Sequence, residues 1–252
     1  MSDSNVISLE VVKHTCHHCC LSGLCLPVDL TAEEGARFNR IVRHGRPLRR
    51  GDHIFRAGES FSAIFFIKSG WVKNYVTNDE GSEQVLGFHI AGEFLGLEAL
   101  EQKAHRFSAQ TLETAVVCEV PFKPLEDLAA DIPALQHQIY LLMSREIRHE
   151  FEMLALFGKR SAEERLAAFL LDLSQRLRVR GLASQNFHLS MSRHDIASYL
   201  GLAVETVSRL FSRFQEESLL AVDRRHIQWL DIQRLENMLA DTAPEAARRQ
   251  GL

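Results

Sequence analysis

The feature that most constrains the fold is a series of short β-rich segments between Arg46 and Phe122, separated by glycine-containing turns. Strands of this length and spacing favour an antiparallel sandwich or roll, and they predict one β domain in the first half of the chain. The predicted strands are His53–Phe55, Ala63–Lys68, Trp71–Val76, Gln84–His89, Phe107–Thr111 and Ala115–Pro121. A short helix capped at Thr31 is expected before them.

A helical period replaces the β pattern from Ile132 to about Lys159, with Pro133 suited to the first turn. A helix of this length spans on the order of 40 Å, and its apolar content on two faces favours a dimer seam. The predicted seam residues are Met143, Ile147, Glu150 and Leu154.

Glu150 makes the predicted seam marginal, because two-fold symmetry would bring it close to the same residue of the partner. Two alternatives stay open from the residues. Glu150 reaches solvent, or it pairs across the seam with Arg145 or Arg148.

Residues 161–230 have the pattern of a helix-turn-helix unit followed by a β-hairpin. A capping box at Ser161 opens one helix, and Gly201 ends a later, short one. The next helix begins at Val204, and in this motif such a helix enters the major groove of DNA. Leu219–Val222 and His226–Leu230 are expected to pair as the hairpin.

Glu205, Ser208 and Arg209 share one face of that second helix. Arginine can bond guanine at two atoms and glutamate can accept from cytosine, so this face suits base reading in double-stranded DNA. Arg213, one turn further on, suits a phosphate. A surface ion pair between Glu205 and Arg209 is the alternative.

The N-terminal segment carries Cys16, Cys19 and Cys25 within ten residues, out of five cysteines in the chain. With no secretion signal we expect a cytoplasmic protein, in which such thiols bind metal rather than form disulfides. Spacing leaves zinc and an iron–sulfur cluster both open. The candidates for a fourth ligand are Cys20, His17, His18 and Cys118.

Composition excludes several other classes. The net charge of −4, from 29 basic and 33 acidic residues, argues against an extended nucleic-acid coat but allows a local DNA-reading surface. No apolar run approaches the roughly 18 residues of a membrane helix. A redox enzyme using Cys19 and Cys20 is disfavoured because no paired acid–base residues accompany them, so we expect a protein that is not an enzyme.

Four stretches together resemble the FNR branch of the CRP/FNR transcription regulators, over nearly the full length. They are the Cys-x2-Cys-x5-Cys of Cys16, Cys19 and Cys25, the run Gln110–Phe122 around Cys118, the run Ala162–Phe169, and Tyr199-Leu-Gly-Leu-Ala-Val-Glu-Thr-Val-Ser-Arg209.

The resemblance implies an α+β chain in five parts. These are a cluster segment at 1–29, a cyclic-nucleotide-binding-like β-roll at 30–131, a dimerisation helix at 132–160, a winged helix-turn-helix at 161–240 and a tail at 241–252. It also implies an oxygen-labile four-iron four-sulfur cluster. The implied ligands are Cys16, Cys19, Cys25 and Cys118.

By the same resemblance, anaerobic homodimers bind TTGAT-N4-ATCAA-type palindromes through Glu205, Ser208 and Arg209, and oxygen destroys the cluster and the dimer. RNA polymerase is the implied partner, with the hairpin Thr77–Ser82 as a candidate contact. Gly92-Glu93 resembles part of the family's nucleotide pocket, but Phe94 and Phe107 interrupt the pattern, so no cyclic AMP binding is expected. Cys20 also departs from the family pattern.

Overall fold

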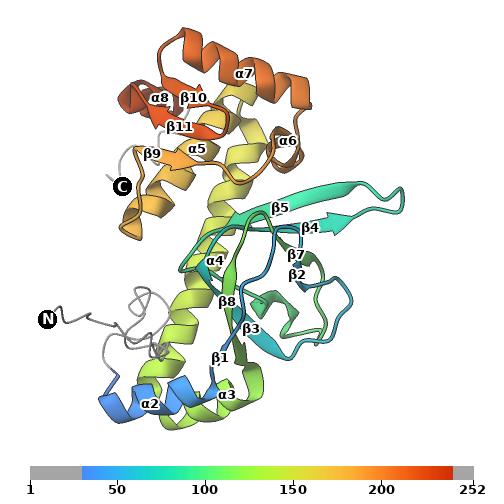
Figure 1. Cartoon of the computed structure of the whole chain (residues 1–252), viewed down its shortest axis with the longest axis vertical. Coiled ribbons are helices and arrows are strands. Elements are labelled where there is room, and N and C mark those ends of the chain that lie inside the picture. Colours follow the sequence, from blue (N-terminus) through green and yellow to red (C-terminus); the bar gives the residue numbers. More distant parts are fainter. Residues whose placement is uncertain (1–29, 241–252) are drawn as a thin grey trace, which may run out of the picture.

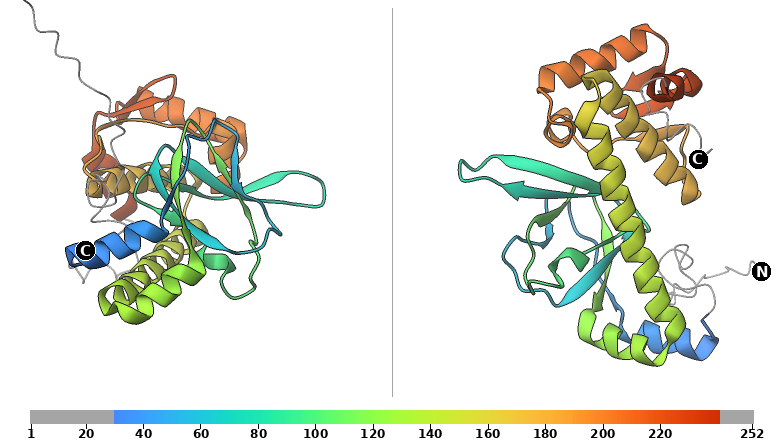
Figure 2. Two further views of the ribbon diagram at one scale, coloured as in Figure 1. Left: turned by 60° about the horizontal axis from the view of Figure 1, so that its bottom comes forward. Right: turned by 180° about the vertical axis from the view of Figure 1, so that it is seen from behind.

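The computed structural model describes residues 30–240, which form an N-terminal β-roll, a long central helix and a C-terminal helical domain (Figures 1 and 2). The predicted α+β class is confirmed. The predicted cluster segment with Cys16, Cys19 and Cys25, and the predicted tail at 241–252, lie outside the described residues. Of the helices within residues 30–240, none has the length and hydropathy to cross a membrane.

Two four-stranded antiparallel sheets form the β-roll, in the strand orders β1-β8-β3-β6 and β2-β7-β4-β5. The strands are β1 (Arg43–His44), β2 (His53–Phe55), β3 (Ala63–Ser69), β4 (Val72–Thr77), β5 (Glu83–His89), β6 (Phe94–Leu95), β7 (Ser108–Thr111) and β8 (Val116–Pro121). Every predicted strand is present within one or two residues. Only β1 and β6 were not predicted, because two-residue strands show no alternation.

The interior of the roll is a cluster to which both sheets contribute, and it explains why the strands alternate in hydrophobicity. Its buried members are Phe55, Ile67, Val72, Leu95, Ala109 and Val117. Gly70 makes the turn between β3 and β4 with a φ of +86°. A Cβ atom there would lie 2.6 Å from the carbonyl oxygen of Thr114, so only glycine fits this close approach.

Three helices pack together on one side of the roll: α2 (Ala32–Ile41), α3 (Phe122–Asp131) and the start of α4 (Pro133–Lys159). The capping box predicted at Thr31 is present, with Glu34 as its partner. α3 was not predicted as a helix. It ends at Asp131 because a proline follows Ile132, and Pro133 then opens α4 as predicted.

The C-terminal domain contains the predicted helix-turn-helix and hairpin. Its elements are α5 (Ala162–Val179), β9 (Asn186–His188), α6 (Arg193–Leu200), α7 (Val204–Glu216), β10 (Leu220–Asp223), β11 (His226–Trp229) and α8 (Ile232–Ala240). β9 and α8 were not predicted. The strand β9 extends the hairpin to a three-stranded sheet in the order β10-β11-β9, and α8 packs on α5.

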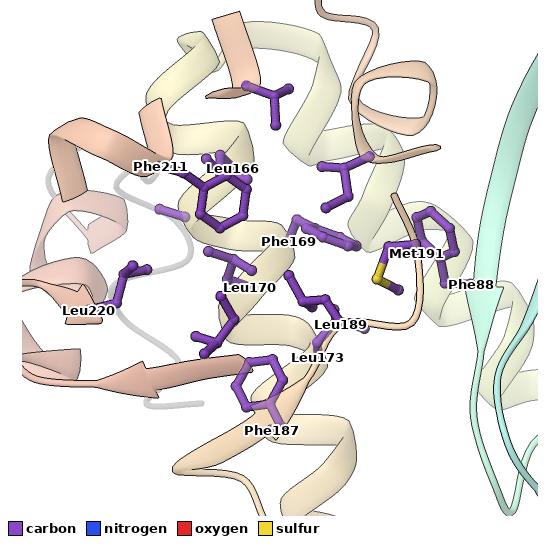
Figure 3. Close-up of a cluster of buried hydrophobic side chains, with 14 of the residues drawn as sticks. Phe88, Leu166, Phe169, Leu170, Leu173, Phe187, Leu189, Met191, Phe211 and Leu220 are labelled. Atoms are coloured by element: carbon purple, nitrogen blue, oxygen red, sulfur yellow. The ribbon is translucent and has the colours of Figure 1, made fainter. Parts of the chain in front are cut away.

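α5 is the centre of the largest core cluster, which Figure 3 shows from one side. Leu166, Leu170 and Leu173 are fully buried along it. Phe88 of β5 belongs to the same cluster, so apolar packing is continuous from the β-roll into the C-terminal domain. The two domains therefore share part of their core.

Leu170→Ala should lower the free energy of unfolding by about 2–5 kcal/mol, because it leaves a cavity at a fully buried site. The matched control is Val179→Ala on the same helix, where the residue is 65% exposed and the expected change is below about 1 kcal/mol. Urea titration followed by circular dichroism measures both. Similar losses in the two variants would contradict this account of the core.

Candidate nucleic-acid interface and cysteine site

A tight turn joins α6 to α7 and fixes the direction of α7. Gly201 adopts the left-handed conformation, with φ 65° and ψ 40°, and its N–H donates to the carbonyl of Ala197. The N–H of Leu202 donates to the same carbonyl at 2.9 Å. Both bonds go to the carbonyl of Ala197 and close the end of α6, so the chain can restart as α7 at Val204.

α7 has one buried and one exposed face. Val207, Phe211 and Phe214 are buried against the domain core. The predicted reading residues Glu205, Ser208 and Arg209 are all exposed on the opposite side. The structure therefore brings the predicted reading residues together on one surface near the start of α7.

The reading residues make few interactions within the chain. Ser208 donates its hydroxyl to the carbonyl of Val204 at 2.9 Å, and a guanidinium nitrogen of Arg209 lies 3.4 Å from the hydroxyl of Thr206. Across residues 30–240 no ion pair joins Glu205 to Arg209. The Glu205 carboxylate and the Arg209 guanidinium can therefore face a ligand without first breaking a pair between them.

Arg213 differs from the other predicted DNA contacts. Its guanidinium lies 2.7 Å from a carboxylate oxygen of Glu163 and 2.7 Å from one of Glu217. The hydrogen bond with Glu217 is the main cause that raises the pKa of Arg213. Arg213 thus ties α7 to α5, a role that its spacing did not predict, and its phosphate contact stays a prediction.

Arg193 supports the reading helix from α6 and was not among the predicted residues. Its guanidinium carbon lies 3.4 Å from the ring centroid of Phe211, a stacking contact between the two helices. Burial, with a smaller effect from the nearby Arg225, lowers the pKa of Arg193 to about 10. No spacing rule in the sequence predicts such a contact between helices.

Cys118 is the one predicted cluster ligand within the described residues. It lies half-buried on β8, opposite His44 of β1, with its sulfur 3.7 Å from Nδ1 of His44. Cys118 and Leu30, the first described residue, pack on the same apolar cluster. Cys25 precedes Leu30 by five positions in the sequence.

This placement is compatible with a metal ligand, because the thiol is partly accessible rather than closed in the core. Within residues 30–240 no group of three or more metal-ligating side chains occurs. The other predicted ligands, Cys16, Cys19 and Cys25, lie outside the described residues.

The outer face of α4 is exposed and apolar. The predicted seam residues Met143, Ile147, Glu150 and Leu154 are all exposed there. Tyr140 and Phe151, exposed by 58% and 67%, belong to the same helix and were not among the predicted seam residues, although Tyr140 lies one heptad before Ile147. Leu142 and Met153, by contrast, are buried.

A second carboxyl group on α4, Glu146, was not among the predicted residues. Glu146 lines a cavity of about 370 Å³ between the β-roll and α4, together with Glu150 and His149. Burial, reinforced by the charges of Glu93 and Glu150, raises the pKa of Glu146 to about 7. Near neutral pH this carboxyl therefore carries a proton in about half of the molecules.

Glu93 joins the two domains. Its carboxylate lies 2.6 Å from Arg176 on α5 and 2.8 Å from Arg180, the residue that follows α5. Burial alone would raise the pKa of Glu93, but the charge and hydrogen bonds of Arg176 prevail and lower it to about 2. The Gly92-Glu93 motif, compared above with a nucleotide pocket, thus forms an ion pair between domains.

The β-roll, long helix and helix-turn-helix together define a transcription regulator of a known architecture. Residues 45–131 match the family model of the cyclic nucleotide-binding domain, and residues 164–238 match the Crp-like helix-turn-helix domain. The structure of FixK2 from Bradyrhizobium japonicum aligns with 78% of this chain and 96% of its own, at a TM-score of 0.71 and 30% identity.

Relatives of known name agree with this class. The transcriptional activator protein Anr of Pseudomonas protegens is 45% identical, over 86% of this chain and 88% of its own. The transcriptional activator protein FnrA of Stutzerimonas stutzeri is 43% identical, over 92% and 94%. The fumarate and nitrate reduction regulatory protein of Yersinia pestis is 43% identical, over 84% and 85%. The chain belongs to the CRP/FNR family, as an FNR-type transcription regulator.

Glu146→Gln should change how stability depends on pH. The pKa of Glu146 is about 7 in the folded chain against an ordinary 4.5, so the folded state binds its proton more tightly. This carboxyl therefore makes the wild type lose stability as pH rises from about 4.5 to 7, by about 3 kcal/mol. Glutamine removes that loss.

The measurement is the difference in unfolding free energy between Glu146→Gln and wild type at several pH values. A difference is needed because burial lowers the pKa of His89 to about 4, which makes stability rise with pH between about 4 and 6.5 in both proteins. The control is Glu152→Gln, an exposed carboxylate on the same helix, which should show no such trend. A difference independent of pH for Glu146→Gln would refute the assignment.

Proposed function

We propose that this regulator is an oxygen-responsive transcription activator that binds TTGAT-N4-ATCAA-type palindromes as a dimer under anaerobic conditions. The observation that carries the proposal is the exposed face of α7 in a helix-turn-helix. There Glu205, Ser208 and Arg209 stand together on a helix whose other face is buried. The names of the FNR-type relatives support the same class of function.

Base reading follows from the donors and acceptors of these side chains. Arg209 offers two parallel N–H donors to O6 and N7 of a guanine. Glu205, one turn earlier, accepts from N4 of the paired cytosine. Ser208 has a hydroxyl that donates to Val204 and still has lone pairs to accept a hydrogen bond from a base.

A dimer is needed because one recognition helix contacts too few base pairs for specific binding. The exposed apolar face of α4 supplies a surface for a second copy, through Met143, Ile147 and Leu154. Each of these side chains would lose contact with water in a parallel pairing of two α4 helices. Burial of this face is favourable by roughly 25 cal/mol per Å² of apolar surface.

Cys16, Cys19, Cys25 and Cys118 would hold a four-iron four-sulfur cluster. When bound, such a cluster supplies an oxygen-labile link between the N-terminal segment and the β-roll. Cys118 contributes a thiol on β8, a strand paired along most of its length with β3, so the link would be anchored in the roll. The same apolar cluster contains Cys118 and residues of α3 and α4, which gives a contiguous path toward the seam helix.

RNA polymerase is the proposed partner of the DNA-bound dimer. The hairpin tip at Thr77–Ser82, between β4 and β5, is exposed and projects from the roll in Figure 1. The side chain of Asn78 holds this turn by accepting from the N–H of Ser82 at 2.8 Å. A fixed, exposed loop of this kind suits a protein contact.

Arg209→Ala should weaken operator binding by about 1–3 kcal/mol and relax discrimination at one G·C pair in each half-site. Fluorescence anisotropy on the palindrome and on duplexes with that pair replaced measures both effects. Arg178→Ala, on an exposed position of α5, should bind all duplexes as the wild type does. A uniform loss across every duplex would make Arg209 a phosphate contact instead.

Cys118→Ala should abolish the visible absorbance and acid-labile sulfide of protein purified without oxygen, together with anaerobic operator binding. Cys20→Ala should leave all of these largely intact, because Cys20 adjoins a ligand position and is not needed as a fourth ligand. Iron, zinc and sulfide assays on both variants accompany the spectra. Zinc without iron or sulfide in the wild type would instead favour a regulator with a structural zinc site and another effector.

A further inference from the structure

The helix-turn-helix rests on the long hairpin of β4 and β5, which reaches out from the β-roll beneath α6 (Figures 1 and 2). This contact joins segments more than one hundred residues apart in sequence. α6 is the helix that precedes the reading helix α7, so whatever fixes α6 also fixes α7.

A buried ion pair lies at the centre of this contact. The ammonium nitrogen of Lys73, on β4, lies 3.1 Å from Oδ1 of Asp195 on α6 and 2.6 Å from a carboxylate oxygen of Glu83 on β5. The Lys73 side chain is only 8% exposed and that of Asp195 13%. A charge this deeply buried is stable only when its partner is present.

Asp195 also holds the start of α6. Its second oxygen, Oδ2, accepts from the N–H of Ser192 at 2.9 Å and from the Ser192 hydroxyl at 2.6 Å. The N–H of Asp195 donates back to that hydroxyl at 3.1 Å, which completes a capping box. One carboxylate therefore closes the first turn of α6 with one oxygen and binds Lys73 of the β-roll with the other.

Backbone bonds from the hairpin fix α6 one turn further along. The N–H of Val85 donates to the hydroxyl of Ser198 at 2.9 Å, and this hydroxyl donates to the carbonyl of Glu83 at 3.0 Å. The side chain of Gln84 donates to the carbonyl of Ser198. Because strand backbone is stiff, these bonds restrict rotation of α6 about the ion pair.

The far end of β5 is attached by apolar contact. The ring of Phe88 lies 5.7 Å from that of Phe169 on α5 and 5.3 Å from that of Tyr199 on α6. This contact is nondirectional, as apolar packing is. The apolar contact holds the two domains together, whereas the ion pair and the hydrogen bonds specify the angle between the hairpin and α6.

We propose that Lys73 is a positioning residue for DNA reading: its ion pair with Asp195 sets the angle of the helix-turn-helix, and thereby the spacing between the two reading helices of a dimer. The proposal rests on the proposed function, because spacing matters only if a dimer binds two half-sites. Lys73 touches no DNA in this assignment and acts through α6.

The test compares duplexes that carry the same two half-sites separated by three, four or five base pairs. Wild type should prefer the four-base-pair spacer. Lys73→Met should reduce that preference about tenfold, within the five- to 150-fold range typical of coupling between sites, because the angle is no longer held. Lys73→Arg keeps the charge and should retain more of the preference.

Lys123→Met is the matched control, since Lys123 also pairs with two carboxylates, of Glu126 and Asp127, but is 75% exposed on α3. It should retain the wild-type preference. Asp195→Asn is the second variant, because asparagine can still accept from Ser192 while losing the charge that binds Lys73. It should shift the spacer preference in the same direction as Lys73→Met.

Hydrogen exchange without DNA supplies an independent readout on the same proteins. In Lys73→Met, amides of β5 and α6, including that of Val85, should exchange faster, while those in the middle of α4 stay unchanged. Unaltered exchange together with unaltered spacer preference would overturn the role of Lys73, as would an equal loss of affinity on all three spacers. Failure of the wild type to bind any of the duplexes would instead overturn the proposed function, whatever the exchange result.

Discussion

The rest of the structure depends on the long helix α4, which has one buried face and one exposed apolar face. One face, with Leu142 and Met153, is buried, and the other exposes Ile147, Phe151 and Leu154. An apolar face left in water is unfavourable, and in proteins of this size such a surface marks an interaction site. This face is exposed in the single chain, and we propose that a second copy covers it.

The β-roll and the C-terminal domain are joined through their core. The cluster around α5 includes Phe88 from the β-roll. Two buried ion pairs between the domains accompany the apolar contact, from Glu93 to Arg176 and from Lys73 to Asp195. Loss of one partner from either pair would leave an unpaired buried charge, which is strongly unfavourable.

Much of this architecture was predictable from the sequence, and the reasons are local. Glycine turns such as the one at Gly70 delimit the strands, and capping boxes at Thr31 and Ser161 mark helix starts within a residue or two. The exposed face of α7 followed from helical spacing alone. Each of these features depends on residues within one turn or one strand of each other.

The parts that the sequence did not predict depend on contacts between distant segments. No pattern near Glu93 reveals that α5 will place Arg176 beside it, and the spacing that singled out Glu150 gave no indication that Glu146 faces the cavity. Lys73 is the clearest case. On a β-strand, a lysine in an alternating pattern is expected to face water. Here it is buried, because the helix-turn-helix covers that side of the hairpin and supplies a carboxylate.

Features set by neighbouring residues and features set by distant contacts can change independently of each other, which allows one fold to respond to different signals. The reading face of α7 is specified within a single helix, so it can stay constant while the sensor changes. The sensor must act through the few residues that cross between the domains. A signal that shifts α4 relative to the roll would alter the cavity that holds Glu146, and Glu93 links the loop after β5 to α5. The ion pairs of Glu93 with Arg176 and of Lys73 with Asp195 are therefore the polar contacts through which a change in the β-roll can reach the helix-turn-helix.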